Sequence, residues 1–300
     1  MTIHHRRLYN AHTYFWHRVL HLPIRLHAAF DNRRRRPALT VIFLHGISAN
    51  SATWRSTIRQ LQREPDLENL RLITLDLLGF GKSLQADWLD YDYAAYDSAL
   101  RATLKHLKVH SPYVLVGHSM GALIAANFAA ATSNATTNAK TTVISSPIAP
   151  PSHLILVSPP VLMVNDLARL PDQIYARSYR TLTRLATAEP AIEVIANFIQ
   201  RFTSFRSRYL KTPAFAKSME NIILSPTNYR TFTSLKTPAL IIHGRFDPLV
   251  MRSNLKRAAA HNSRHLRYVG VMGQHDISVN KRAKIILELK RILKEQANAK

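Results

Sequence analysis

A serine flanked by glycines lies at the centre of the apolar run YVLVGHSMGALIAANFAA, residues 113–130. The pattern G-x-S-x-G separates residues typical of a buried strand from an alanine-rich stretch typical of a helix. A sharp turn at such a junction holds the serine in a strained backbone conformation and presents its hydroxyl. We therefore expect Ser119 to be a nucleophile, although a plain Gly-Ser turn would also fit the pentapeptide alone.

A serine hydroxyl becomes a good nucleophile only when a base takes its proton and a third group holds that base. Asp247 follows an apolar run in ALIIHGRFDPLV, and His275 lies in the glycine-flanked stretch VGVMGQHDISV. Asp247 could merely open a turn, and His275 could be an ordinary loop histidine. The order serine, acid, histidine is the one expected with a nucleophile elbow, so we predict that Ser119, Asp247 and His275 form a catalytic triad.

Acyl transfer also needs backbone N–H groups that hold a developing oxyanion. Met120, directly after the serine, supplies one such group. The second is expected from FLHGISANSATW, where His45 and Gly46 end a strand-like run and the N–H of Ile47 is the candidate. The side chain of Ile47 is free to line a pocket instead.

The stretch DLLGFGKS, residues 76–83, ends like a phosphate-binding loop. The Walker pattern requires glycine at the position that Asp76 occupies, so a nucleotide hydrolase is excluded. We interpret Asp76, Gly79 and Gly81 as a structural turn beside the site.

Short, nearly all-apolar runs position these residues, and each run ends in Gly, Ser, Asp or Pro. Such runs are typical of strands buried on both faces of a parallel sheet. They span residues 38–46, 70–79, 113–119, 153–160 and 239–244, and helical patterns occupy 51–63, 93–108 and 120–131. The alternation predicts an α/β domain whose ligands bind at the carboxyl ends of the strands.

Two segments interrupt this alternation. Residues 131–152, rich in Ser, Thr, Asn and Pro, indicate a flexible surface insertion, and the long helical interval that follows predicts a lid. The expected organisation is a basic N-terminal extension at 1–37, a core at 38–160 and 237–300, and a helical cap at 161–236.

The chain is strongly basic, with 41 Lys and Arg against 18 Asp and Glu and a net charge of +23. A large positive charge bears on solubility and on attraction to polyanions or anionic membranes rather than on fold. The sequence contains no recognisable nucleic-acid-binding module, so we expect no nucleic-acid partner. Tyr14, Phe15, Val19 and Leu20 could share the face of an N-terminal helix, which either packs on the domain or lies on an anionic membrane surface. The run 33–36, four arginines, indicates a solvated turn between two strands.

Cysteine is absent from the 300 residues, which excludes disulfides, thiol catalysis and zinc-thiolate sites. The six histidines among the first 27 residues match no metal motif, so no metal site is expected. No window has the length of a transmembrane span, and the N-terminus lacks the apolar core of a signal peptide. We expect a cytoplasmic protein that acts on a small-molecule ester, and the oligomeric state stays open.

Taken together, FLHGISANSATW, DLLGFGKS, GHSMG, HGRFDPLV and GQHD resemble the α/β-hydrolase superfamily over residues 38–295. The resemblance implies an α/β-hydrolase fold with a mostly parallel eight-stranded sheet, a helical cap between the sixth and seventh strands, and no cofactor. It assigns Ser119 as nucleophile, Asp247 as acid and His275 as base, with the N–H groups of Ile47 and Met120 as the oxyanion hole.

A serine at the elbow argues against the epoxide hydrolases and haloalkane dehalogenases of this superfamily, which place aspartate there. We expect a carboxylesterase that cleaves small to medium apolar acyl or aromatic esters through an acyl-enzyme. Three alternatives are kept: a C–C bond hydrolase of the meta-cleavage type, a lipid or monoacylglycerol lipase at an anionic membrane surface, and a non-enzymatic ligand receptor. The superfamily hosts all these activities, so the fold alone does not choose among them.

Overall fold

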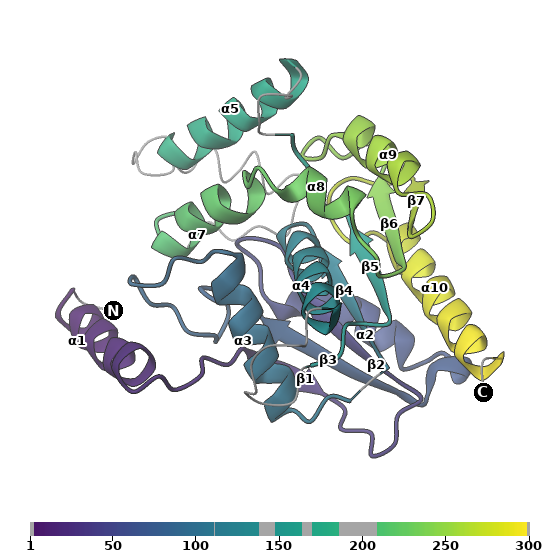
Figure 1. Cartoon of the computed structure of the whole chain (residues 1–300), viewed down its shortest axis with the longest axis horizontal. Coiled ribbons are helices and arrows are strands. Elements are labelled where there is room, and N and C mark those ends of the chain that lie inside the picture. Colours follow the sequence, from purple (N-terminus) through teal and green to yellow (C-terminus); the bar gives the residue numbers. More distant parts are fainter. Residues whose placement is uncertain (1–2, 111, 138–147, 164–169, 186–208, 299–300) are drawn as a thin grey trace.

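One sheet with helices on both faces forms the centre of the molecule in a computed structural model, which describes residues 3–110, 112–137, 148–163, 170–185 and 209–298 (Figure 1). The strands are β1 (His27–Asp31), β2 (Leu39–Leu44), β3 (Leu70–Asp76), β4 (Tyr113–His118), β5 (His153–Val157), β6 (Ala239–Gly244) and β7 (Leu266–Val271). Their order in the sheet is β1-β3-β2-β4-β5-β6-β7, and every neighbouring pair is parallel except β1 with β3. The predicted α/β class and mostly parallel sheet are confirmed.

The number of strands differs from the expected eight, because the described residues form seven. The helical insertion lies between β5 and β6 rather than between a sixth and a seventh strand. Two strands follow the insertion both in the predicted eight-stranded sheet and in the observed seven-stranded one. The difference of one strand therefore lies before the insertion. Before β1 the described chain is helical, with α1 (Ile3–Tyr14) and the π-helix η1 (Phe15–Val19), and β1 forms the edge of the sheet.

The edge strand β1 belongs to the segment 1–37 that we expected to precede the core. Its last residue, Asp31, accepts two hydrogen bonds from the Arg71 guanidinium on β3, at 3.1 and 2.7 Å. The four arginines 33–36 that follow are exposed and connect β1 to β2, which confirms the predicted turn between two strands. The folded unit therefore begins earlier than the apolar pattern indicates.

Side chains of the central strands alternate between two apolar layers. On β2, Ile42 and Leu44 pack in the layer that contains residues of α3 (Tyr93–His106), α4 (Met120–Thr137) and α9 (Arg252–His261). Val41 and Phe43 pack in the opposite layer, with α2 (Arg55–Leu61) and α10 (Val279–Asn298). All five predicted strands and all three predicted helical stretches are present at these positions.

The insertion between β5 and β6 contributes the helices α5 (Leu170–Leu185), α7 (Pro213–Ser218), η5 (Met219–Ile223) and α8 (Asn228–Thr233). It contacts the loop that leaves the carboxyl end of β3, where the Tyr209 hydroxyl accepts a 2.9 Å hydrogen bond from the N–H of Gly81. The buried carboxylate of Asp172 anchors α5 through the side chain of Asn254 on α9. These helices therefore lie at the carboxyl end of the sheet, at the top of Figure 1.

The predicted surface insertion at 131–152 is only partly described. Helix α4 extends into it as far as Thr137, so the helix is longer than the pattern indicates. Residues 138–147 lie outside the described residues.

Candidate active site

Ser119 occupies a sharp turn between β4 and α4. Its φ is +53°, a left-handed conformation that costs energy for a residue other than glycine. A Cβ added to Gly117 would lie 2.4 Å from the carbonyl oxygen of Gly121, and one added to Gly121 would lie 2.5 Å from the carbonyl oxygen of His45. The two glycines are therefore needed because the turn closes against backbone. The strand, turn and helix of a nucleophile elbow are all present.

The loop after β2 passes directly beside the serine. A Cβ added to Gly46 would lie 3.1 Å from the Cβ of Ser119, which brings the next residue, Ile47, to the elbow. Met120 opens α4, so its N–H has no acceptor within the helix. Among the described residues, no hydrogen bond uses the N–H of Ile47 or Met120. Both predicted oxyanion donors are thus available near Ser119.

The buried side chain of His45 fixes this loop, a role that the sequence did not reveal. Its Nδ1–H donates to the carbonyl oxygen of Gly46 at 2.7 Å, and its Nε2 accepts from the N–H of Leu77 at 2.9 Å. Burial lowers the pKa of His45 to about 4, so the ring is neutral at pH 7. A neutral ring is what this pair of bonds requires, because one nitrogen donates and the other accepts.

Asp247 and His275 meet on adjacent loops that follow β6 and β7. The Nδ1 of His275 lies 2.8 Å from Oδ2 of Asp247, and the other carboxylate oxygen accepts from the N–H of Leu249 at 2.9 Å. Burial alone would raise the pKa of Asp247, but its electrostatic interaction and hydrogen bond with His275, together with the nearby Lys281 ammonium, outweigh burial and hold that pKa at about 2. The carboxylate is therefore charged when it meets the imidazole.

His118, the residue before the serine, connects the elbow to the histidine loop. Its Nε2–H donates to the carbonyl oxygen of His275 at 3.0 Å, and the two rings lie 5.0 Å apart between centroids. Burial and the nearby charges of His275 and Lys281 lower the pKa of His118 well below its ordinary value, so its ring is neutral. The elbow is thus bonded to the loop that carries His275 through His118, whereas in the described part of the chain no hydrogen bond joins Ser119 Oγ to His275 itself.

A fully buried lysine, Lys281 on α10, holds the same loop from the other side. Its Nζ donates to Oγ of Ser158 and to the carbonyl oxygens of Gln274 and His275, at 2.8, 2.5 and 2.8 Å. Burial lowers the pKa of Lys281 to about 8, against the opposing charges of Asp247 and Asp276. An ammonium group has three N–H donors, so each of them has one acceptor here.

Neither His118 nor Lys281 was predicted, although one signal for the lysine is visible in the sequence. Lys281 shares a helical stripe with Ile285, Leu289 and Ile292, which are all buried. A basic residue on the apolar stripe of an amphipathic helix indicates that its charged group has a buried partner. The pattern does not identify that partner, because the acceptors lie on other segments.

The turn at DLLGFGKS supports the site without forming part of it. The buried carboxylate of Asp76 accepts from the backbone N–H groups of Ser51 and Lys82, at 2.8 and 2.9 Å. Gly81 adopts φ +60°, and a Cβ there would collide with that carboxylate. The structure confirms the predicted structural turn, which ties the loop after β2 to the loop after β3.

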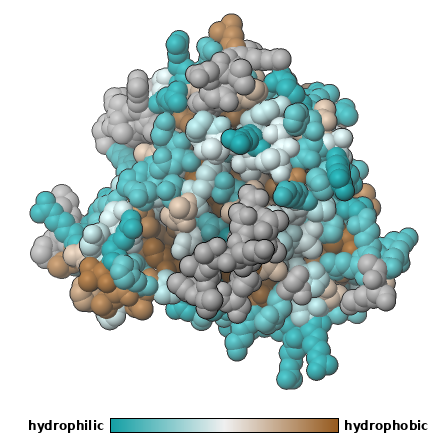
Figure 2. Space-filling model, in the orientation of Figure 1, coloured by the Kyte–Doolittle hydropathy of each residue, from teal (hydrophilic) through white to brown (hydrophobic). Residues whose placement is uncertain are grey.

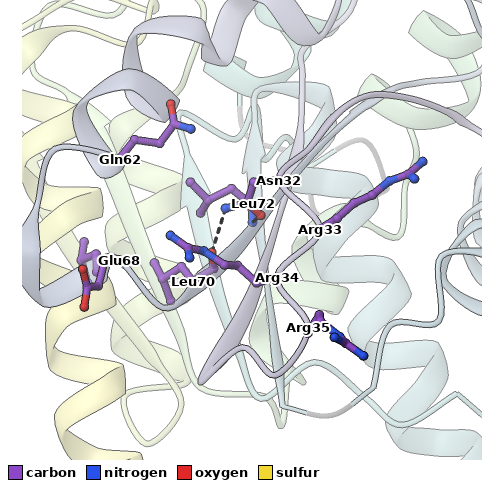
Figure 3. Close-up of a pocket in the computed structure, with 9 residues that line it drawn as sticks. Asn32, Arg33, Arg34, Arg35, Gln62, Glu68, Leu70 and Leu72 are labelled. Carbon is purple, nitrogen blue, oxygen red and sulfur yellow. Dashed lines mark hydrogen bonds between the residues drawn. The ribbon is translucent and has the colours of Figure 1, made fainter.

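A separate hollow lies at the opposite end of β3 (Figure 3). It is lined by Asn32, the arginines 33–35, Gln62, Leu67, Glu68, Leu70 and Leu72. The amide of Asn32 donates to the carbonyl oxygen of Leu70 across it, at 3.0 Å. Leu70 is the first residue of β3, whereas the elbow lies at the carboxyl ends of the strands. This hollow is therefore distinct from the candidate site.

An elbow serine, a loop with free N–H groups and an Asp–His pair at the carboxyl ends of a mostly parallel sheet define the α/β-hydrolase class. The family described as alpha/beta hydrolase fold matches residues 40–281, and the chain belongs to this family.

Similar proteins differ in the activities for which they are named. A probable lysophospholipase, BODYGUARD 4 of Arabidopsis thaliana, is 33% identical over 112 residues, 37% of this chain and 26% of that protein. A 2-succinyl-6-hydroxy-2,4-cyclohexadiene-1-carboxylate synthase of Klebsiella pneumoniae subsp. pneumoniae is 36% identical over 105 residues, 35% of this chain and 37% of that enzyme. The solved structure of a thermophilic esterase from Thermogutta terrifontis superposes over 92% of this chain and 98% of its own, with a TM-score of 0.64 and 18% identity. At 18% identity, the similarity to the thermophilic esterase shows a shared fold.

Proposed function

We propose that this α/β hydrolase is a carboxylesterase that cleaves esters of small to medium apolar acyl or aromatic groups through an acyl-enzyme. Ser119 is the nucleophile, His275 the base and Asp247 the acid. The observation that carries the proposal is the 2.8 Å contact between His275 Nδ1 and the buried Asp247 carboxylate beside the elbow. An ionised acceptor keeps the proton on Nδ1, which leaves Nε2 as the basic nitrogen.

In the first half of the reaction, Oγ of Ser119 attacks the ester carbonyl carbon while Nε2 of His275 takes the hydroxyl proton. The oxyanion that forms is held by the N–H groups of Ile47 and Met120. When the tetrahedral intermediate collapses, the bond to the alcohol oxygen breaks and His275 returns the proton to that oxygen. The acyl group stays on Ser119.

In the second half, His275 removes a proton from water, and the resulting hydroxide attacks the acyl carbon. When this second tetrahedral intermediate collapses, the bond between the acyl carbon and Oγ breaks, His275 returns the proton to Oγ of Ser119, and the carboxylic acid is released. The described helices between β5 and β6 act as a cap that shields these steps from bulk water. Its position at the carboxyl ends of the strands supports this role.

Ester cleavage is favoured over the other activities because two similar proteins bear names of ester-cleaving enzymes, a lysophospholipase and an esterase. The synthase among the relatives keeps C–C bond chemistry as an alternative. Both chemistries would use the same serine and oxyanion hole, so substrates distinguish them better than mutations.

Burst kinetics on p-nitrophenyl esters of graded chain length test the proposal. We expect a rapid release of about one p-nitrophenol per enzyme before the steady state, because p-nitrophenol is a good leaving group and acylation is then faster than deacylation. A dienoic diketone and a lactone are assayed beside the esters. Turnover of the diketone without turnover of any ester would contradict the proposal, and binding of these compounds without any turnover would indicate a receptor.

Within this mechanism Lys281 is a positioning residue for His275. Lys281→Met is expected to lower kcat roughly tenfold to a hundredfold with little change in KM, because the loop that carries the base loses a donor and shifts. Above pH 8 the wild-type lysine loses its proton and has two N–H donors for three acceptors. The wild-type pH profile of kcat should therefore show a limb near pH 8 that the variant lacks.

The matched control is Lys294→Met, which removes an exposed lysine from the same helix. It should keep wild-type kcat and the same pH profile. A Lys281→Met variant with unchanged kcat and an unchanged limb near pH 8 would show that the lysine is only structural.

A further inference from the structure

One face of the N-terminal helix is fixed to the loop that follows β3. The Arg6 guanidinium makes two hydrogen bonds to the carboxylate of Asp87, at 2.9 and 2.7 Å, and the Asn10 amide adds a third at 2.8 Å. The indole N–H of Trp88 donates to the Thr13 hydroxyl at 3.1 Å. Arg6, Asn10 and Thr13 recur at helical spacing, so α1 docks on the domain through a polar face.

The opposite face of this helix is apolar and exposed. Leu8 follows Arg6 by two residues and Phe15 follows Thr13 by two, a rotation of about 200° around the helix. Of the thirteen large exposed hydrophobic side chains in the described chain, seven lie between residues 8 and 22: Leu8, Tyr14, Phe15, Trp16, Val19, Leu20 and Leu22. Figure 2 shows a brown hydrophobic patch at the lower left, where Figure 1 places this segment. Tyr14 packs on Trp88, with 5.8 Å between ring centroids, and so belongs to the docked side. We call the other six side chains, of which Leu20 and Leu22 follow the end of η1, the N-terminal apolar face.

The N-terminal segment is basic, and two aspartates of the loop after β3 neutralise part of its charge: Asp87 pairs with Arg6, and Asp90 lies 3.9 Å from Arg18. Residues 1–30 contain four arginines and six histidines, and neither aspartate nor glutamate. Arg7 is exposed on α1, Arg25 is exposed and lies 2.7 Å from Nδ1 of His106, and the guanidinium of Arg18 lies 5.6 Å from the ring centre of Trp88. The occupant of this face must therefore accept apolar side chains and provide negative charge.

We propose that α1 and η1 dock this protein on the surface of a bilayer that contains anionic lipid. A helix with one apolar, aromatic-rich face and surrounding arginines is suited to lie in the headgroup region, its apolar side chains sinking about 5–10 Å. Tryptophan and tyrosine favour that depth, and each arginine near the surface gains from anionic headgroups. The face is the convex side of one helix rather than a groove, which fits a deformable lipid surface better than a folded partner. No helix in the described ranges has the length and hydropathy to cross a membrane.

The same loop joins this docking surface to the helical insertion. Lys217 on α7 donates to the carbonyl oxygens of Asp87 and Leu89, at 3.1 and 2.6 Å, and Asn221 on η5 donates to that of Asp90 at 2.7 Å. Thus α1 and α7 contact one loop at the carboxyl end of the sheet. Docking through α1 would place this shared loop, to which α7 is also bonded, beside the lipid.

Vesicle binding of the full chain tests the proposal without depending on catalysis. Phosphatidylcholine vesicles with and without phosphatidylglycerol are sedimented with the wild type and with the double variant Phe15→Asp and Val19→Asp. We expect wild-type binding at least tenfold stronger on the anionic vesicles at 0.15 M salt, and a loss of at least tenfold in the double variant. Leu287→Asp is the matched control, because Leu287 is 59% exposed on the basic helix α10, and it should bind like the wild type.

Insertion of the apolar face has its own readout in tryptophan fluorescence. Brominated lipid should quench the wild type and should quench Trp16→Phe less, since Trp54 is fully buried and Trp88 is half-buried beneath the helix. Equal binding by wild type and double variant would reduce the interaction to overall charge and overturn the proposal. A dimer that only the double variant dissociates would overturn it too. Equal hydrolysis of a water-soluble ester without vesicles, or equal melting curves, shows that the variant is folded.

Discussion

Ser119→Ala is expected to lower ester hydrolysis by about a thousandfold or more, because the acyl-enzyme can no longer form. Residual activity would come from the oxyanion donors and substrate binding, which the substitution leaves in place. The measurement is kcat and kcat/KM on the best p-nitrophenyl ester, with burst amplitude as a second readout. Wild-type rates in Ser119→Ala would contradict the assignment.

Ser48→Ala is the matched control for this experiment. Ser48 is buried in the loop after β2 and has a φ of +56°, against +53° for Ser119. In the described part of the chain its hydroxyl has no hydrogen-bond partner. Both substitutions therefore place alanine in a similar strained conformation. Ser48→Ala should keep activity close to that of the wild type, which separates the loss of a nucleophile from backbone strain.

Asp247→Asn is expected to lower kcat by about 10⁴, through the tautomer of His275 rather than through loss of the side chain. Oδ1 of Asp247 already accepts from the N–H of Leu249, and Oδ2 faces Nδ1 of His275. In the variant the amide oxygen keeps the backbone bond, so the NH₂ group faces the imidazole. The ring must then accept at Nδ1 and carry its proton on Nε2, where it cannot act as a base.

The control for this substitution is Asp276→Asn, which neutralises the carboxylate next to His275 in the chain. It should cost less than tenfold in kcat. An Asp247→Asn variant that is no slower than Asp276→Asn would contradict the role given to Asp247.

The lowered pKa of Asp247 also predicts how this carboxylate affects stability. Its pKa falls from 3.8 to about 2 on folding, so the charged form stabilises the fold fully above about pH 4 and ceases to do so as the pH falls toward 2. The difference in Tm between wild type and Asp247→Asn should therefore shrink across that interval. A difference that stays constant from pH 6 to pH 2 would contradict the shift.

The parts of the site that could be predicted are those encoded in short stretches of sequence. The elbow is local, because its strand, its two glycines and its helix are contiguous. Asp247 was identifiable because it follows a strand-like run, and His275 because it lies in a glycine-flanked stretch and completes the order serine, acid, histidine. Asp247 and His275 meet because β6 pairs with β7. The hydrophobic periodicity does not show that pairing, although neighbouring strands of a parallel sheet end at the same edge. Their catalytic roles stay predictions until they are tested.

The parts that could not be predicted depend on long-range contacts. Strand β1 has the sequence HAAFD and is only partly buried, so it lacks the continuous apolar pattern of the central strands. Its identity comes from pairing with β3. His45 and His118 look like polar ends of strands until their acceptors are known. The strand count was wrong because the expected total came from a resemblance, whereas residues 3–19 of this chain are helical.

The hydrogen bond between His118 and the carbonyl of His275 joins residues 157 positions apart. During synthesis the elbow is therefore made long before the base that activates it. Domains generally fold as units as they are synthesised, but Ser119 on a nascent chain would lack Asp247, His275 and Lys281. The emerging hydroxyl would be no more reactive than that of an ordinary serine. Hydrolytic activity would begin only when β6, β7 and the start of α10 have joined the sheet.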